Sequence, residues 1–231
     1  MATRRSFLAG SAALSLSLPL LDRQGAFAQD ATPEASPATA EEIRPPQDLL
    51  PTNWGRVEGE TVNLNGIDIY YEVYGEGDPL LLLHGGLGNG TYWANQIPAF
   101  AAEYQVIVMD SRGHGRSSFD ATPISYDLMS SDVLALLDHL EIDRTDLVGW
   151  SDGGIIGLDI AQTNPERLNK VVAYGANFDP SGVRLDVGTN DRFNAYINQA
   201  AADYLTTSPE PERWDEFLGN ISNMWATEPN W

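Results

Sequence analysis

The sequence predicts a single α/β domain built around a doubly wound, mostly parallel β-sheet. From Pro79 onward, apolar runs of strand length alternate with helical patterns, which is typical of parallel strands joined by helices. Glycine-rich turns follow several of these runs, where a strand would give way to a helix. Ahead of this region, Asn65-Gly66 joins two short strand-like runs and predicts a tight hairpin.

The expected elements follow from this pattern in chain order. Strands are expected at Thr61–Leu64, Ile67–Tyr74, Pro79–Leu83, Gln105–Met109, Asp146–Trp150 and Val171–Tyr174. Helices are expected at Thr91–Ala102, Ser125–Leu140 and Gly153–Thr163, followed by lid-like helical segments at about Asp191–Thr206 and Glu210–Met224. Roughly 180 residues of this kind can bury one core.

The segment Gly149–Gly154 carries the most informative motif. It reads Gly-Trp-Ser-Asp-Gly-Gly and lies between an apolar run and a helical pattern. A buried strand that breaks at a serine and enters a helix predicts a nucleophile elbow, with Ser151 as the exposed nucleophile. The small residues on either side let strand and helix approach closely. The alternative is a glycine-rich turn whose serine only caps a helix.

A second glycine-rich turn, His84–Gly90, follows the run Pro79–Leu83. In enzymes with such an elbow, a turn at this place offers a backbone N–H to the oxyanion that develops during acyl transfer. Two donors are needed there. We predict that they are the N–H groups of Gly86 and of Asp152, the residue after the nucleophile.

A third motif, Asp110–Ser118, follows the run Gln105–Met109. With HGG, DSRGHGRSS and GWSDGG in this order and spacing, the chain resembles the α/β-hydrolases over about residues 60–231. The stretch Gly149–Asn177 is most similar to the valacyclovir hydrolase-like serine esterases. A serine at the elbow disfavours the dehalogenase and epoxide-hydrolase branches, which use aspartate there. The resemblance implies an α/β-hydrolase fold and carboxylic-ester hydrolysis through an acyl-Ser151 intermediate.

The resemblance also implies a catalytic histidine after the last strand, and this sequence has none there. Its histidines, His84, His114 and His139, all precede Ser151. A serine hydroxyl is a poor nucleophile until a base takes its proton. We expect His84 to shape the oxyanion turn, His114 to be structural, and His139 to be exposed or at the core boundary. Activity should therefore be very low or absent.

The catalytic acid has one candidate. In relatives the acid follows the seventh strand, or in some the sixth, and Asp179 stands at the latter position. The alternative is a loop aspartate that starts a turn with Pro180 and Gly182. We expect the seventh and eighth strands to be missing, as in a hydrolase truncated at its C-terminus within a partial helical lid. Val171–Tyr174 would then form an open apolar edge, which favours self-association and marginal stability.

The N-terminus predicts export to a periplasmic or extracellular destination. Arg4-Arg5 stands before a short apolar run, and Ala26-Phe27-Ala28 suits cleavage before Gln29. An uncleaved membrane anchor is the alternative. The predicted divisions are a twin-arginine signal peptide at 1–28, a disordered linker rich in Pro, Ala and Thr at 29–54, the α/β-hydrolase core at 55–176, and the start of the lid at 177–231.

The charge of the chain limits its partners. With 13 Lys+Arg against 33 Asp+Glu, the formal net charge is −20. So acidic a surface repels nucleic acid and anionic membranes, which excludes both as partners beyond transient membrane contact of the signal peptide. Scattered histidines and the lack of cysteine predict no metal site, and no cofactor is expected. The expected partner is a small-molecule ester.

Asp152 and Trp150 are the expected substrate contacts. In the valacyclovir hydrolase-like esterases the carboxylate beside the nucleophile holds the substrate's α-amino group, so Asp152 would favour amino-acid esters. The alternative is a carboxylate that faces solvent. Two other functions stay open. One is a non-catalytic remnant or binding module, which the missing histidine favours, and the other is a cofactor-free perhydrolase that works through the same acyl-enzyme.

Overall fold

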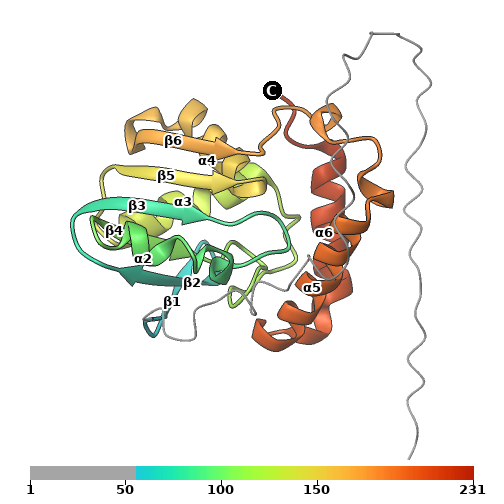
Figure 1. Cartoon of the computed structure of the whole chain (residues 1–231), viewed down its shortest axis with the longest axis horizontal. Coiled ribbons are helices and arrows are strands. Elements are labelled where there is room, and N and C mark those ends of the chain that lie inside the picture. Colours follow the sequence, from blue (N-terminus) through green and yellow to red (C-terminus); the bar gives the residue numbers. More distant parts are fainter. Residues whose placement is uncertain (1–55) are drawn as a thin grey trace, which may run out of the picture. The chain divides into compact units, whose positions relative to one another are not determined.

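The computed structural model describes residues 56–231 of the 231-residue chain (Figure 1). The predicted signal peptide and linker, 1–28 and 29–54, lie outside the described residues. Six strands form one sheet in the order β1-β2-β4-β3-β5-β6. They are β1 (Glu60–Leu64), β2 (Ile67–Tyr74), β3 (Asp78–Leu83), β4 (Tyr104–Met109), β5 (Thr145–Trp150) and β6 (Leu168–Tyr174).

The sheet is mostly parallel, as the sequence predicts. β3 pairs in parallel with β4 and β5, and β5 pairs in parallel with β6. β1 and β2 form an antiparallel hairpin, and β2 also pairs antiparallel with β4. Asn65 and Gly66 at the hairpin turn both have positive φ, 49° and 84°, which is the backbone that this residue pair favours.

Two hydrophobic clusters fill the two faces of the sheet. Successive residues of β3 point to opposite faces, so Leu81 and Leu83 join one cluster while Leu80 and Leu82 join the other. The larger cluster lies under α3 (Tyr126–His139) and α4 (Asp152–Thr163), and the smaller one under α2 (Ile97–Phe100). A run of leucines is therefore buried on both sides, as expected of a central parallel strand.

The single helix predicted at Thr91–Ala102 is wrong. The segment forms a 3₁₀ turn, Gly90–Trp93, and then the short helix α2. Pro98 has no N–H to bond to the carbonyl of Ala94, so an α-helix cannot run through it, and it lies instead in the first turn of α2. For the same reason the helix predicted from Glu210 begins later, because Pro211 starts a 3₁₀ turn before α6 (Trp214–Thr227).

The helices α5 (Asp191–Thr207) and α6 stand across the carboxyl ends of the parallel strands (Figure 1). Ser125 caps α3 by accepting a hydrogen bond from the N–H of Leu128, and Glu228, just after α6, accepts one from the N–H of Tyr126 at 2.9 Å. The bond to Glu228 joins the end of the lid segment to the start of a core helix.

A buried ion pair fixes the loop after β4. The guanidinium of Arg112 donates two hydrogen bonds of 2.8 Å to the carboxylate of Asp132 on α3, and both side chains are at most 1% exposed. Asn65 of the hairpin turn also donates to Asp132, at 2.9 Å. The loop, the hairpin and α3 are therefore joined at one carboxylate.

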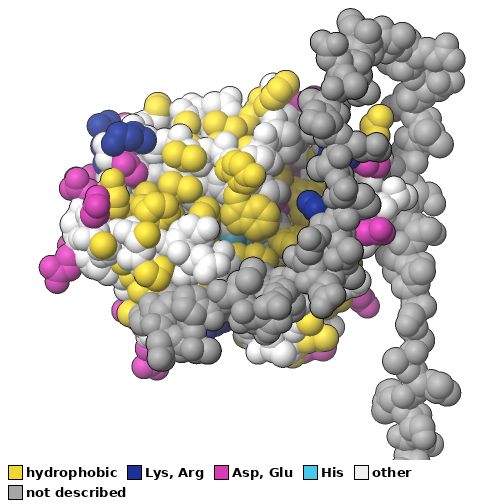
Figure 2. Space-filling model, viewed as in Figure 1, with side chains coloured by type: hydrophobic (Ala, Val, Ile, Leu, Met, Phe, Trp, Pro, Cys, Tyr) yellow, Lys and Arg dark blue, Asp and Glu magenta, His cyan; other side chains and the backbone are white. Residues whose placement is uncertain are grey.

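Among residues 56–231, β6 is the last strand on one side of the sheet, and two of its apolar residues are exposed. Val172 is 55% and Tyr174 is 75% exposed, which agrees with the predicted apolar edge. Figure 2 shows hydrophobic side chains at the surface over the β5–β6 end of the sheet. None of the helices within residues 56–231 is both long and apolar enough to span a bilayer.

Candidate functional site

The chain makes a sharp turn at Ser151, between β5 and α4. Ser151 has φ +51° and ψ −121°, a backbone conformation that is costly for a residue with a side chain. Its N–H donates to the carbonyl of Tyr174 on β6 at 2.8 Å, and its carbonyl accepts from the N–H of Ile155 at 3.0 Å. Its side chain makes no capping hydrogen bond. Ser151 thus stands at the N-cap position of α4 without a side-chain capping bond, in the strained backbone geometry that is typical of a nucleophile elbow.

Close backbone packing at the elbow requires glycine. A Cβ on Gly149 would lie 2.6 Å from the backbone nitrogen of Gly154, and one on Gly153 would lie 2.6 Å from the carbonyl oxygen of His84. Real Cβ atoms do not approach backbone so closely. The glycines of the motif therefore let α4 start directly against the ends of β3 and β5.

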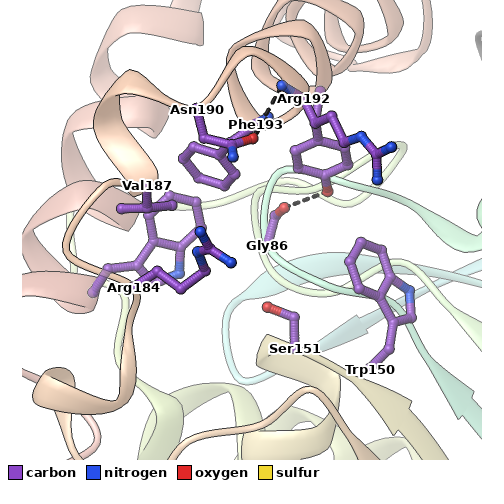
Figure 3. A pocket seen from close by; sticks show the side chains of 10 residues that line it. Gly86, Trp150, Ser151, Arg184, Val187, Asn190, Arg192 and Phe193 are labelled. Carbon is purple, nitrogen blue, oxygen red and sulfur yellow. Dashed lines mark hydrogen bonds between the residues drawn. The ribbon is translucent and has the colours of Figure 1, made fainter. Parts of the chain in front are cut away.

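Ser151 lies at the floor of a pocket of about 490 Å³ (Figure 3). The pocket is formed between the elbow, the turn after β3, and the lid segment. Its lining residues are Gly86, Trp150, Ser151, Arg184, Val187, Asn190, Arg192, Phe193, Tyr196 and Trp225. The predicted substrate contact Trp150 is among them. Its ring is stacked with that of Tyr92 and lies in an edge-to-face arrangement with that of Tyr196.

The predicted oxyanion donors are brought together. Gly86 lies against the residue after the nucleophile, since a Cβ on Gly86 would be 2.9 Å from Cγ of Asp152. The carbonyl of Gly86 accepts a hydrogen bond from the hydroxyl of Tyr196 at 2.6 Å. Within residues 56–231 neither the N–H of Gly86 nor that of Asp152 donates a hydrogen bond. Gly86 lines the pocket and Asp152 directly follows Ser151 in the chain, so both N–H groups lie close to the serine without an acceptor in this part of the chain.

The side chain of Asp152 does not face solvent. It is 4% exposed, and its carboxylate accepts hydrogen bonds from Nε1 of Trp225 at 2.8 and 3.0 Å and from the hydroxyl of Tyr126 at 3.1 Å. Burial raises the pKa of this carboxyl to about 6, although the hydrogen bonds from Trp225, Tyr126 and Ser151 lower it. The solvent-facing alternative is therefore wrong, and Asp152 does not line the pocket.

None of the three histidines lines the pocket. Nε2 of His84 accepts from the N–H of Ser111 at 3.0 Å, so Nδ1 carries the proton and donates to the carbonyl of Gly85 at 2.8 Å. His84 thus holds the turn after β3 against the loop after β4, which agrees with the turn-shaping role expected of it. His139 is exposed at the end of α3, also as expected.

His114 is buried beside His84, with ring centroids 5.0 Å apart, and Nδ1 lies 2.9 Å from the carbonyl of Arg112. Burial, and secondarily the neighbouring His84, lower the pKa of His114 to about 3, and burial also lowers the pKa of His84. Both rings are neutral at neutral pH. Their positions agree with the structural roles predicted for them.

Asp179 lies in the turn after β6 and outside the pocket lining. Its carboxylate accepts a hydrogen bond of 2.7 Å from the N–H of Ser181, at the start of a 3₁₀ turn, Pro180–Gly182. These bonds to Ser181 lower the pKa of the carboxyl. The local geometry is that of an aspartate that starts a turn, and among residues 56–231 no histidine is hydrogen-bonded to its carboxylate.

Sequence reasoning missed most of the pocket. Tyr126 and Trp225 hold the carboxylate of Asp152, and Arg192, Phe193 and Tyr196 come from α5. No local motif marks these residues. The one available signal was the aromatic content of the lid segment, since residues 193–225 include two phenylalanines, two tryptophans and two tyrosines. Within residues 56–231 no cluster of three or more His, Asp or Glu side chains could hold a metal ion.

Comparisons with known proteins agree with this geometry. A model of the α/β hydrolase fold family matches residues 78–223. RutD of Azorhizobium caulinodans, assigned as a carbamate hydrolase, is 40% identical over 104 residues, which is 45% of this chain and 39% of that protein. The 3-oxoadipate enol-lactonase 2 of Acinetobacter baylyi is 39% identical over 115 residues, 49% of this chain and 43% of that protein.

Among solved structures, Est816, described as an N-acyl homoserine lactone degrading enzyme, has a TM-score of 0.53 at 32% identity. That match covers 74% of this chain and 68% of Est816. The chain matches less than half the length of RutD and less than half the length of the enol-lactonase.

Proposed function

The chain belongs to the α/β-hydrolase family, and we propose that it is a serine hydrolase that cleaves carboxylic esters through an acyl-Ser151 intermediate. One observation carries this proposal. Ser151 sits in the strained elbow conformation at the floor of the pocket, beside two N–H groups that have no acceptor among residues 56–231. That arrangement suits attack on a carbonyl whose oxygen takes up negative charge.

The proposed reaction has two steps. Oγ of Ser151 attacks the ester carbonyl and loses its proton to a base, while the N–H groups of Gly86 and Asp152 donate to the oxyanion. The bond to the alcohol then breaks, and the alcohol leaves with a proton. Water attacks the acyl-serine by the same route and releases the acid. Lactones, as internal esters, fall within this class, and the Acinetobacter relative is named for one.

We expect the reaction to be very slow in this chain. The rings of His84 and His114 are hydrogen-bonded to backbone carbonyls, and burial lowers the pKa of both. No histidine lines the pocket, so none of the three is placed to take the proton of Ser151. An oxyanion hole and binding without the full triad leave a residual acceleration of about 10³–10⁴ over water in well-studied serine proteases.

The test is rescue by an external base. We expect added imidazole to raise the hydrolysis of p-nitrophenyl acetate by the chain in proportion to its concentration, after subtraction of the rate with the Ser151→Ala variant. Mass spectrometry should find one acyl group on the peptide that contains Ser151. Equal rates for the two proteins at every imidazole concentration would refute the proposal and leave the non-catalytic binding module as the function.

We also propose that the protein is exported by the twin-arginine route. The basis is the sequence alone: Arg4-Arg5, the apolar run and Ala26-Phe27-Ala28. In a host with this pathway, the protein should accumulate outside the cytoplasm with Gln29 as its N-terminus. Replacing both Arg4 and Arg5 by Lys should keep it inside, and export of that variant at the same level would contradict the proposal.

A further inference from the structure

The pocket over Ser151 has a charge opposite to that of the whole chain. Arg184 and Arg192 line it, and no Asp or Glu is among its lining residues. The chain as a whole has 33 acidic against 13 basic residues. Two guanidinium groups in one pocket are therefore a local exception, placed where a substrate would be bound.

Arg192 carries the charge that is free to bind a ligand. Within residues 56–231 its guanidinium has no hydrogen bond and no ion pair. The guanidinium of Arg184 is already bonded to the carboxylate of Asp186 at 2.9 and 2.8 Å. Figure 3 shows Arg184 and Arg192 on opposite sides of the pocket, with Ser151 below them. Arg192 is therefore the stronger candidate for an ionic contact.

The start of α5 does not itself offer free N–H groups to an anion. The side chain of Asn190 accepts hydrogen bonds from the N–H groups of Arg192 and Phe193, both at 3.1 Å. What remains available there is the guanidinium of Arg192, which can donate to both oxygens of a carboxylate.

The remaining wall of the pocket is apolar and aromatic. Trp150, Phe193, Tyr196 and Trp225 line it. The carboxylate of Asp152, the residue after the nucleophile, is buried and bonded to Trp225 and Tyr126. An ammonium group would have to displace these bonds to reach it. The pocket therefore favours an anion with an apolar body over the amino-acid ester that Asp152 suggests in the sequence.

We propose that the substrate of this pocket is an ester that carries a carboxylate on an aromatic or other apolar body, and that Arg192 binds this carboxylate. The proposal rests on the ester hydrolysis proposed above and names its substrate class. Because Arg192 is solvent-accessible, the ionic contact is screened, and it should strengthen binding by about five-fold. The contact should weaken further as salt is added.

The test measures binding without catalysis. The fluorescence of Trp150 and Trp225 reports on the pocket, and the full chain is titrated with 4-phenylbutyrate and with its neutral amide, 4-phenylbutyramide. We expect the carboxylate to bind about five-fold more tightly than the amide at low salt. Arg192→Gln should abolish the difference, and Arg192→Lys should keep part of it. Lys170→Gln, which removes the same charge at an exposed site outside the pocket lining, should change nothing.

The Ser151→Ala variant tests the binding of a carboxylate by Arg192 separately from the hydrolysis of esters by Ser151. If it keeps the preference for the carboxylate while no ester is hydrolysed by the native chain, the binding proposal stands and the catalytic one fails. Equal affinity for the carboxylate and the amide, no binding of either, or an unchanged preference in Arg192→Gln would each overturn the assignment of Arg192.

Discussion

Gly153 shows how one residue can permit the geometry of a site. It lies in the first turn of α4, where a Cβ would meet the backbone of Leu83 and His84. Gly219 also lies in a helix, α6, but a Cβ there would meet nothing within 4 Å. Identical substitutions at these two positions should therefore have opposite effects on stability.

We expect Gly153→Ala to lower the free energy of unfolding by about 2–3 kcal/mol, because neither backbone segment can move without distorting the elbow. Gly219→Ala should raise it by about 0.5–1 kcal/mol, because alanine has less backbone freedom to lose in a helix. Urea titration of both variants checks this. A destabilised Gly219→Ala variant, or an unchanged Gly153→Ala variant, would contradict the packing at the elbow.

Asp152 should make stability depend on pH in an unusual direction for a carboxyl group. Burial raises its pKa from 3.8 to about 6, so between about pH 4 and pH 6 the folded chain binds more protons than the unfolded chain. Its contribution to stability is therefore greatest below pH 4 and is lost as the pH rises through 6. The size of this loss should be about 3 kcal/mol, at about 1.36 kcal/mol for each unit of the rise in pKa.

The Asp152→Asn variant isolates this effect, because other carboxyls titrate in both proteins alike. The measurement is the difference in unfolding free energy between the two proteins at pH 4 and at pH 7. We expect the native chain to lose more stability than the variant over this interval. Parallel pH profiles would show that the carboxyl titrates normally.

At the scale of elements, the loop after β4 depends on its ion pair with α3. Arg112 and Asp132 are both almost fully buried, so removal of one charge leaves the other without compensation. The exposed pair Lys170–Asp146, with 79% of the lysine side chain accessible, provides a contrast on β5 and β6.

We expect Arg112→Met to lower the free energy of unfolding by about 3–5 kcal/mol, because among the described residues the charge of Asp132 then keeps only the hydrogen bond from Asn65. Lys170→Ala should change it by less than about 1 kcal/mol. Chemical denaturation of both variants is the measurement. Similar losses in the two would mean that burial of the pair does not govern its contribution.

For the whole molecule, β6 presents an edge that another strand can pair with. Val172 and Tyr174 are exposed on the same side of this strand. The edge has no strand beyond it within residues 56–231. We propose that a second copy of the chain pairs there around a two-fold axis, because an isologous contact lets the same edge serve both copies.

Tyr174→Lys should shift the protein toward the monomer, because a charge on an edge strand opposes pairing. Leu205→Lys, at a residue of α5 that is 59% exposed, is the control and should leave association unchanged. Sedimentation velocity over a range of protein concentrations measures both. A native chain that is monomeric throughout and unfolds in one cooperative transition would contradict the proposed pairing.

Local sequence patterns were sufficient to predict the strands and the sharp turn at Ser151. The run Leu80–Leu83 can only be buried on both faces, and Gly-x-Ser-x-Gly at the junction of strand and helix leaves few backbone conformations open to Ser151. The order of the motifs along the chain likewise predicted the fold. The buried strand and the turn at Ser151 depend on residues that are close in sequence, so the sequence itself shows their physical causes.

What the sequence by itself determined was the α/β-hydrolase fold, the position of Ser151 and the two neighbouring N–H groups. Only the tertiary structure decided the surroundings of Asp152, because its hydrogen-bond donor Trp225 is 73 residues away. It also decided that Arg192 lines the pocket. Such contacts depend on how α5 and α6 pack over the sheet, and packing between distant segments leaves no local pattern in the chain.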